Sequence, residues 1–173
     1  YQNINLTILL IIFAIYKYFA KFDSVKLTTN IENKKFGPMK VNYLNKVLEY
    51  TQRSGYEVLY QDDKSGIIKI SNEDDGISQV ILGVVPPILI IECFLFAVKK
   101  DDMGMYKALL QKNRDVLHGA FVLNEEGTKI LYRYTIQIEN LDYNEFEAAL
   151  NSLSLMLHEY SGKIIEFSQQ QLN

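Results

Sequence analysis

Cysteine is almost absent from this chain of 173 residues, because Cys93 is the only one. A single cysteine excludes an internal disulfide and is consistent with a reducing compartment. A surplus of basic residues is also missing, since the formal net charge is −3 and the pI is about 5.4. Nucleic-acid-binding domains usually concentrate Lys and Arg on one face, so this charge argues against nucleic acid as a partner.

Signatures of catalysis and of cofactor binding are missing as well. The two histidines, His118 and His158, have no cysteine or carboxylate near them at metal-ligand spacing. The chain has no Gly-rich phosphate loop, nucleotide fingerprint or Ser/His/Asp arrangement. Cys93 lies in an apolar run, where burial is expected to raise the pKa of the thiol and leave it unreactive. We therefore expect no metal, no cofactor and no enzymatic activity.

The residues that are present predict one globular domain preceded by a separate segment. The hydrophobic share is 48%, and 12 Tyr and 9 Phe supply enough apolar surface for a sizeable core. Residues 1–22 are predicted to form an apolar helix and residues 23–38 a polar linker that ends at Gly37-Pro38. Residues 39–173 are the expected folded domain.

The apolar segment resembles a membrane anchor. Residues 1–16 carry no charge, and Lys17, Lys21 and Lys26 follow them. A helix of that length spans about 24 Å, slightly less than the roughly 30 Å of a bilayer core. If residues 4–20 insert in a membrane, the basic flank places the domain on its cytoplasmic side. The alternatives are a helix packed on this domain or on a partner, and a segment that is not native to the domain.

Hydrophobic periodicity and turn residues predict the elements of the domain. Proline cannot donate to a strand ladder, so Pro86-Pro87 should separate two strands. The second helix is expected to face inward through Met105, Tyr106, Leu109 and Leu110, with Asn113 or Arg114 at its end. The predicted helices are 40–54, a segment that starts at Asp101 and Asp102, and a long one from Asp142; the predicted strands are 56–61, 67–71, 78–82, 88–98, 119–123 and 128–138.

This order, α-β-β-β(β)-α-β-β-α, predicts an α+β fold in which helices pack on one face of an antiparallel sheet. Strands 88–98 and 128–138 are apolar on both faces, more than one layer of helices needs to cover. The surplus is a candidate surface for a protein partner or a second copy of the chain, or a face that the N-terminal helix covers. Its candidate residues are Ile88, Ile90, Phe94, Phe96, Tyr132, Tyr134 and Ile136.

Glu92 interrupts the apolar run 88–98. A carboxylate there must be exposed on the outer face, paired, or protonated. Arg133 and Arg114 are the candidate partners for a paired Glu92. A catalytic carboxylate, working with His118 or Arg133, is the third alternative.

Several segments resemble the bacterial YbjN family, often labelled type III secretion chaperone-like. They are Leu109 to Arg114, His118 to Leu123, Leu131-Tyr-Arg133, Asn151 to Leu157, Gly76-Ile-Ser78 and Ile88 to Phe96. The similarity covers residues 40–168 and implies the layout derived above. It also implies homodimerisation and the binding of an extended or amphipathic segment of a partner, and it implies no catalytic residue.

Three functions remain open at this point. The leading hypothesis is a cytoplasmic, non-enzymatic protein-binding module, chaperone-like or regulatory, that acts through an apolar sheet face or edge. The second is a structural or assembly component of a larger complex, tethered to the inner face of the membrane by the N-terminal segment. The third is an enzyme that uses Glu92.

Overall fold

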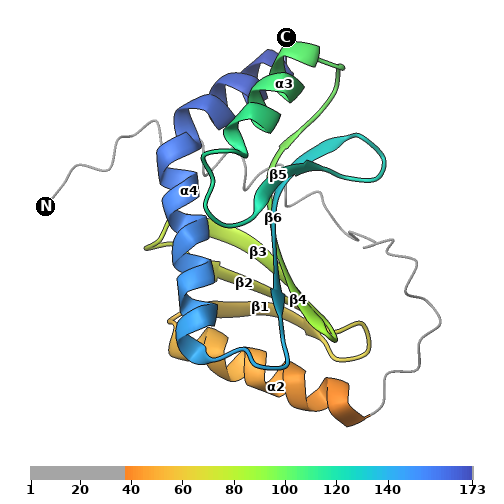
Figure 1. The fold of residues 1–173 in the computed structure, drawn as a ribbon, viewed down its shortest axis with the longest axis vertical. Coiled ribbons are helices and arrows are strands. Elements are labelled where there is room, and N and C mark those ends of the chain that lie inside the picture. The colour runs from red at the N-terminus through yellow and green to blue at the C-terminus, as the bar shows by residue number, and fades with distance from the viewer. Residues whose placement is uncertain (1–37, 173) are drawn as a thin grey trace, which may run out of the picture. The chain divides into compact units, whose positions relative to one another are not determined.

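The computed structural model describes residues 38–172 (Figure 1). Within them, helices and strands follow one another in the predicted order. The elements are α2 (Pro38–Arg53), β1 (Glu57–Asp62), β2 (Ile67–Asn72), β3 (Ile77–Val85), β4 (Ile88–Ala97), α3 (Met103–Lys112), β5 (Ala120–Leu123), β6 (Lys129–Gln137) and α4 (Tyr143–Gln170).

The six strands form one sheet in the order β1-β2-β3-β4-β6-β5, and every neighbouring pair is antiparallel. Strands β1 to β4 are joined by successive turns, whereas β6 pairs with β4 after the chain has passed through α3 and β5. The predicted α+β fold with an antiparallel sheet is confirmed. Pro86 and Pro87, joined by a cis peptide bond, separate β3 from β4 as expected.

Local signals in the sequence set the ends of the helices. The Asp102 carboxylate accepts a hydrogen bond from the Met105 amide at 3.0 Å, and Asp142 accepts one from the Glu145 amide at 2.8 Å. Each aspartate thereby satisfies an amide that has no partner within its helix. Shortly after α2, Gly55 has a φ of +76°, a conformation that glycine adopts without steric cost.

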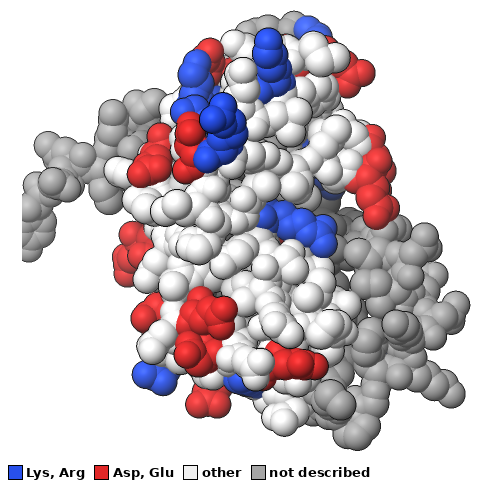
Figure 2. Space-filling model, viewed as in Figure 1, with Lys and Arg blue, Asp and Glu red and all other residues white. Residues whose placement is uncertain are grey.

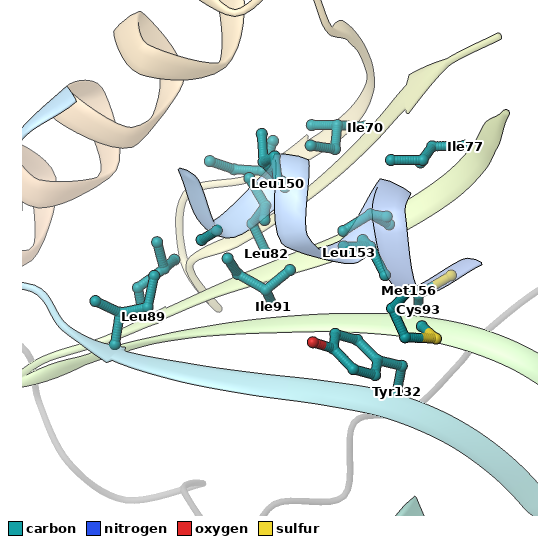
Figure 3. Close-up of a cluster of buried hydrophobic side chains, with 14 of the residues drawn as sticks. Ile70, Ile77, Leu82, Leu89, Ile91, Cys93, Tyr132, Leu150, Leu153 and Met156 are labelled. Atoms are coloured by element: carbon teal, nitrogen blue, oxygen red, sulfur yellow. The ribbon is translucent and has the colours of Figure 1, made fainter. Parts of the chain in front are cut away.

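Helix α4 crosses one face of the sheet, which we call the first face (Figure 1). Leu150, Leu153 and Met156 of α4 lie against Leu82 and Ile91 of the sheet (Figure 3). All five are buried, and Leu153, Leu82 and Ile91 have no exposed surface. Burial of each such side chain contributes about 1.5–3 kcal/mol, so this contact fixes α4 on the sheet.

Helices α2 and α3 join the same core. Val47 of α2 is fully buried, and the ring of Tyr50 lies 5.8 Å from that of Phe146 in α4. From α3, Met105 and Leu109 enter the core. The expectation that Leu110 faces inward is wrong, because its side chain is 67% exposed. Met105 and Leu109 are four residues apart on the inner side of α3, and Leu110 lies about 100° further around the helix.

The predicted apolar helix 1–22 and the predicted linker up to Gly37 lie outside the described residues and stay predictions. In the part of the chain that the structure describes, none of the helices combines the length and hydropathy that a membrane crossing requires.

Candidate functional site

The pairing of β4 with β6 divides the candidate surface between the two faces of the sheet. Leu89 lies opposite Ile136 and Cys93 opposite Tyr132, so these four side chains share the first face. Tyr132 and Ile136 are 1% and 6% exposed and belong to the core under the helices. Tyr134 is partly buried against the same core. The three β6 residues of the candidate set therefore contribute to the core under the helices.

Phe96 also belongs to the core, because a β-bulge in β4 changes the direction in which its side chain points. Plain alternation along β4 would place Phe96 on the same side as Ile88, Ile90 and Phe94. The register shifts between Phe94 and Phe96, so that Phe96 lies opposite Ile130 on the first face. Phe96 is 2% exposed and belongs to the core. An extra residue in one strand reverses the facing of every residue beyond it, which the sequence pattern alone does not indicate.

The remaining candidates lie on the opposite side, which we call the second sheet face. Register places Ile88, Ile90 and Phe94 there, with Ile81 of β3 and Leu131 of β6 beside them. Ile90 is 7% exposed and the other four are half-buried, yet none of the five packs against the core that the helices cover. The second sheet face therefore holds an apolar group that the described helices do not use.

An ion pair lies in the middle of this face. Arg133 Nη1 donates a hydrogen bond to Glu92 Oε1 at 2.9 Å across the β4–β6 pair. The pair stands between Ile90 and Phe94 along β4. The Glu92 side chain is 10% exposed and the Arg133 side chain 38%. Burial raises the pKa of Glu92 above its ordinary value, although the charge and hydrogen bond of Arg133 act in the opposite direction.

Of the two arginines predicted to pair with Glu92, the structure places Arg133 there. Arg114 is exposed in the turn that follows α3 and makes no ion pair with any residue of 38–172. Exposure of Glu92, the simplest of the three expectations, is not observed, because the residue is 8% exposed.

His118 lies toward the first face instead of joining Glu92. Its Nδ1 is 3.4 Å from the Tyr134 hydroxyl, and its carbonyl accepts a hydrogen bond from the Tyr132 hydroxyl. Tyr134 lies opposite Ile91, whose neighbour Glu92 points to the second sheet face. No hydrogen bond connects His118 with Glu92 in residues 38–172, so the acid and base of the enzyme hypothesis are not brought together.

The segment before β5 is held by contacts that the sequence did not reveal. The Asn113 side chain accepts from the Phe121 amide at 2.8 Å and donates to the Phe121 carbonyl at 3.2 Å. Gly119 has a φ of +75°, and a Cβ atom there would lie 2.6 Å from Tyr132 Cζ. In the sequence, an asparagine and then a glycine stand between the helix and the next strand. That order does not indicate that Asn113 bonds to Phe121 or that Gly119 lies against Tyr132.

Among the described residues, few side chains are placed for catalysis or for metal binding. Cys93 is buried, and burial raises the pKa of its thiol to about 12, so the thiol is protonated at neutral pH. Residues 38–172 contain no group of three or more His, Cys, Asp or Glu side chains arranged to hold a metal ion. What the arrangement can do is offer apolar contact surface around one charged pair.

One of two similar solved structures, that of YbjN, shares this fold. The crystal structure of YbjN from E. coli, proposed to be a transcription regulator, matches with a TM-score of 0.56 at 10% identity. That match covers 69% of this chain and 92% of YbjN. The structure of the HopA1–SchA chaperone–effector complex matches with a TM-score of 0.47 at 13% identity, over 76% of this chain and 94% of that one. No curated protein matches the chain at a significant level.

The family of the chain follows from a match to a family model. The CesT_Tir_1 family model matches residues 40–170, which include every strand and nearly all of the three described helices. This range agrees with the resemblance expected over residues 40–168, and the expected likeness to YbjN is confirmed. The chain therefore belongs to the CesT_Tir_1 family, a type III chaperone-like family.

Proposed function

We propose that this protein is a non-enzymatic, chaperone-like module that binds an apolar segment of another protein on its second sheet face. One observation carries the proposal. Four apolar side chains, Ile81, Ile88, Ile90 and Leu131, gather on that face without entering the core that the helices cover. Grouped apolar side chains of this kind are typical of protein interaction sites.

The charged pair indicates what the bound segment must supply. A guanidinium carries five N–H donors, and Arg133 donates one of its hydrogen bonds to Glu92 while its side chain remains 38% exposed. A bound segment that covers Arg133 must therefore accept hydrogen bonds from it, through main-chain carbonyls or a carboxylate. An apolar stretch of polypeptide with such an acceptor at its centre matches both features, and a purely apolar ligand would leave the guanidinium buried without partners.

Membership of a type III chaperone-like family supports a protein as the bound molecule. The separation of His118 from Glu92 and the protonated, buried Cys93 weigh against a catalytic role. A catalytic acid or base needs its reacting partner within hydrogen-bond reach, and among residues 38–172 the side chain that bonds to Glu92 is that of Arg133.

A peptide library displayed against the full-length protein tests the proposal. We expect the selected peptides to be apolar with an acidic or extended centre. One synthesised peptide is then titrated against Ile88→Glu, which introduces charge on the second sheet face. Leu59→Glu is the matched control, because Leu59 is an exposed apolar residue of another strand, β1, at 43% exposure.

The expected result is a loss of about ten-fold or more in affinity for Ile88→Glu, since truncated or charged interface positions of this kind typically cost over 1 kcal/mol. The Leu59→Glu control should bind within about two-fold of the unaltered protein. Circular dichroism of both variants confirms that they fold. Equal affinity of the two variants, or a library that yields no peptide, would contradict the proposal.

A further inference from the structure

The second sheet face has no side chain at one point near its centre. Gly83 of β3 lies on this face opposite Ile90 of β4. A Cβ atom added at Gly83 would meet Ile90 Cβ at 3.6 Å, an ordinary van der Waals contact, so nothing in residues 38–172 requires glycine there. Glycine inside a strand often marks a site that another backbone approaches closely. Gly83 therefore favours a closely packed occupant on this face.

Residues 1–16 of the same chain have the chemistry that such an occupant needs. They contain no charged residue and are mostly apolar. Asn5, Ile8 and Ile12 are three and four residues apart, the spacing of one side of a helix. In the predicted helix, that side combines isoleucine side chains with the carbonyl of an asparagine. It therefore offers apolar contact together with the hydrogen-bond acceptor that a segment covering Arg133 must supply.

The predicted linker is long enough for this segment to reach the face. Residues 17–37 separate it from Pro38, where α2 begins. A flexible chain of that length has an end-to-end distance of about 25 Å and extends to about 70 Å. The ten residues of β4, by comparison, span about 33 Å. Tethering through such a linker gives the segment an effective concentration on the order of 1 mM at the face.

The charges of the two parts of the chain are complementary. Residues 1–38 contain five Lys against Asp23 and Glu32, which gives a formal charge of +3. Because the whole chain has a net charge of −3, residues 39–173 carry −6. Figure 2 shows acidic side chains over the lower part of the domain, where Figure 1 places α2 and the start of α4. Attraction between opposite net charges favours return of the N-terminal residues to their own domain.

We propose that, in the absence of a partner, residues 4–16 of this chain cover the second sheet face and must leave it before a segment of another protein binds there. The inference rests on the proposed function and adds the regulation of the same site. An outside segment of equal intrinsic affinity displaces a tethered one only near the effective concentration of the latter. Below that concentration, a partner must bind the face more tightly than residues 4–16 do, which makes binding selective.

One pair of variants of the full-length protein tests the inference. Ile8→Glu with Ile12→Glu places two charges on the side of the segment that is expected to contact the face. The matched control, Thr28→Glu with Thr29→Glu, places the same two charges in the predicted linker. All four positions precede α2, so neither variant alters the core of the domain.

Methyl NMR without any peptide reports on the occupant directly. We expect the methyl signals of Ile88 and Ile90, on the second sheet face, to move in the segment variant, because the charged segment leaves the face. The signal of Ile91, on the first face, should stay in place. All three signals should stay in place in the linker control.

Titration with the library-selected peptide reports on the competition. Release of a tethered competitor should raise the affinity of the segment variant by about ten-fold or more, while the linker control binds within about two-fold of the unaltered protein. A peptide that binds all three proteins equally would overturn the inference and leave the proposed function standing. A library that yields no peptide for any of them would contradict the proposed function, and the methyl comparison would then decide the inference alone.

Three NMR results would overturn the inference. The first is a segment variant whose Ile88 and Ile90 signals coincide with those of the unaltered protein. The second is a difference that appears only as the protein concentration is raised, which would assign the face to the segment of another copy. The third is flotation of the unaltered protein with phosphatidylcholine vesicles while these signals are unchanged by the variant, which would assign residues 4–16 to a membrane.

Discussion

The two faces of the sheet are built from similar residues and have different surroundings. On the first face, Leu82, Ile91 and Tyr132 are covered by α4 and have almost no exposed surface. On the second face, Ile88 and Phe94 are half-buried, and an ion pair stands at the centre of the apolar group. Hydrophobic sequence alone does not distinguish a face that the described helices cover from one that they do not. The position of the helices makes that distinction.

The largest expected effect concerns the first face. Leu153→Ala removes a fully buried side chain of α4 and leaves a cavity against the sheet. The variant should lose about 2–5 kcal/mol of unfolding free energy in urea titrations. Leu155→Ala, on the exposed side of the same helix, should lose less than about 0.5 kcal/mol. Similar losses for the two variants would show that α4 does not pack as described.

Removal of the charged partner on the second face should have a smaller effect. Arg133→Met leaves the Glu92 carboxylate in an apolar setting without its hydrogen bond. Breaking a fully buried pair costs about 3–5 kcal/mol, and the half-exposed arginine reduces this to about 2 kcal/mol. Urea titration measures the loss. The double variant Arg133→Met with Glu92→Met should recover most of it, and failure to recover would mean that Arg133 stabilises the fold through other contacts.

Loss of the Asn113 side chain should cost about 1–2 kcal/mol. Asn113→Ala leaves both the amide and the carbonyl of Phe121 without their bonds at the end of the first-face core. The matched control is Asn144→Ala, an exposed asparagine in the first turn of α4. Thermal unfolding should separate the two variants by several degrees. Coincident melting temperatures would show that the bonds to Phe121 contribute nothing.

The smallest effect is a pH dependence specific to the second face. The pKa of Glu92 is raised in the folded protein, so the folded state holds this proton more tightly than the unfolded state. The resulting stabilisation is fully present below the ordinary pKa of 4.5 and is lost as pH rises through the raised value. Urea titrations from pH 4 upward should show this decline in the unaltered protein and lack it in Glu92→Gln. An identical pH dependence in both would contradict the assignment.

Local signals in the sequence predicted most of the fold. Pro86-Pro87 separated two strands, and Asp102 and Asp142 marked helix starts because each caps an amide near its own position in the chain. These features depend on neighbours in sequence, which periodicity and turn chemistry describe well.

Features that depend on distant residues were not predictable in the same way. The bulge before Phe96 arises from the pairing of β4 with β6, and it moved Phe96 from the expected partner surface into the core. The choice of Arg133 over Arg114 as the partner of Glu92 also requires the strand order. The exposure of Leu110 depends on how α3 is rotated against α4, which no local pattern sets.

The most direct test of the account is a methyl NMR titration of the full-length protein with a library-selected peptide, using isotope-labelled isoleucine. Ile81, Ile88 and Ile90 report on the second sheet face, and Ile68, Ile91 and Ile136 report on the first. The account predicts that the methyl signals of Ile81, Ile88 and Ile90 shift as peptide is added, while those of Ile68, Ile91 and Ile136 stay in place. Shifts confined to the first-face isoleucines, or saturation of binding with no shift at Ile81, Ile88 and Ile90, would contradict it.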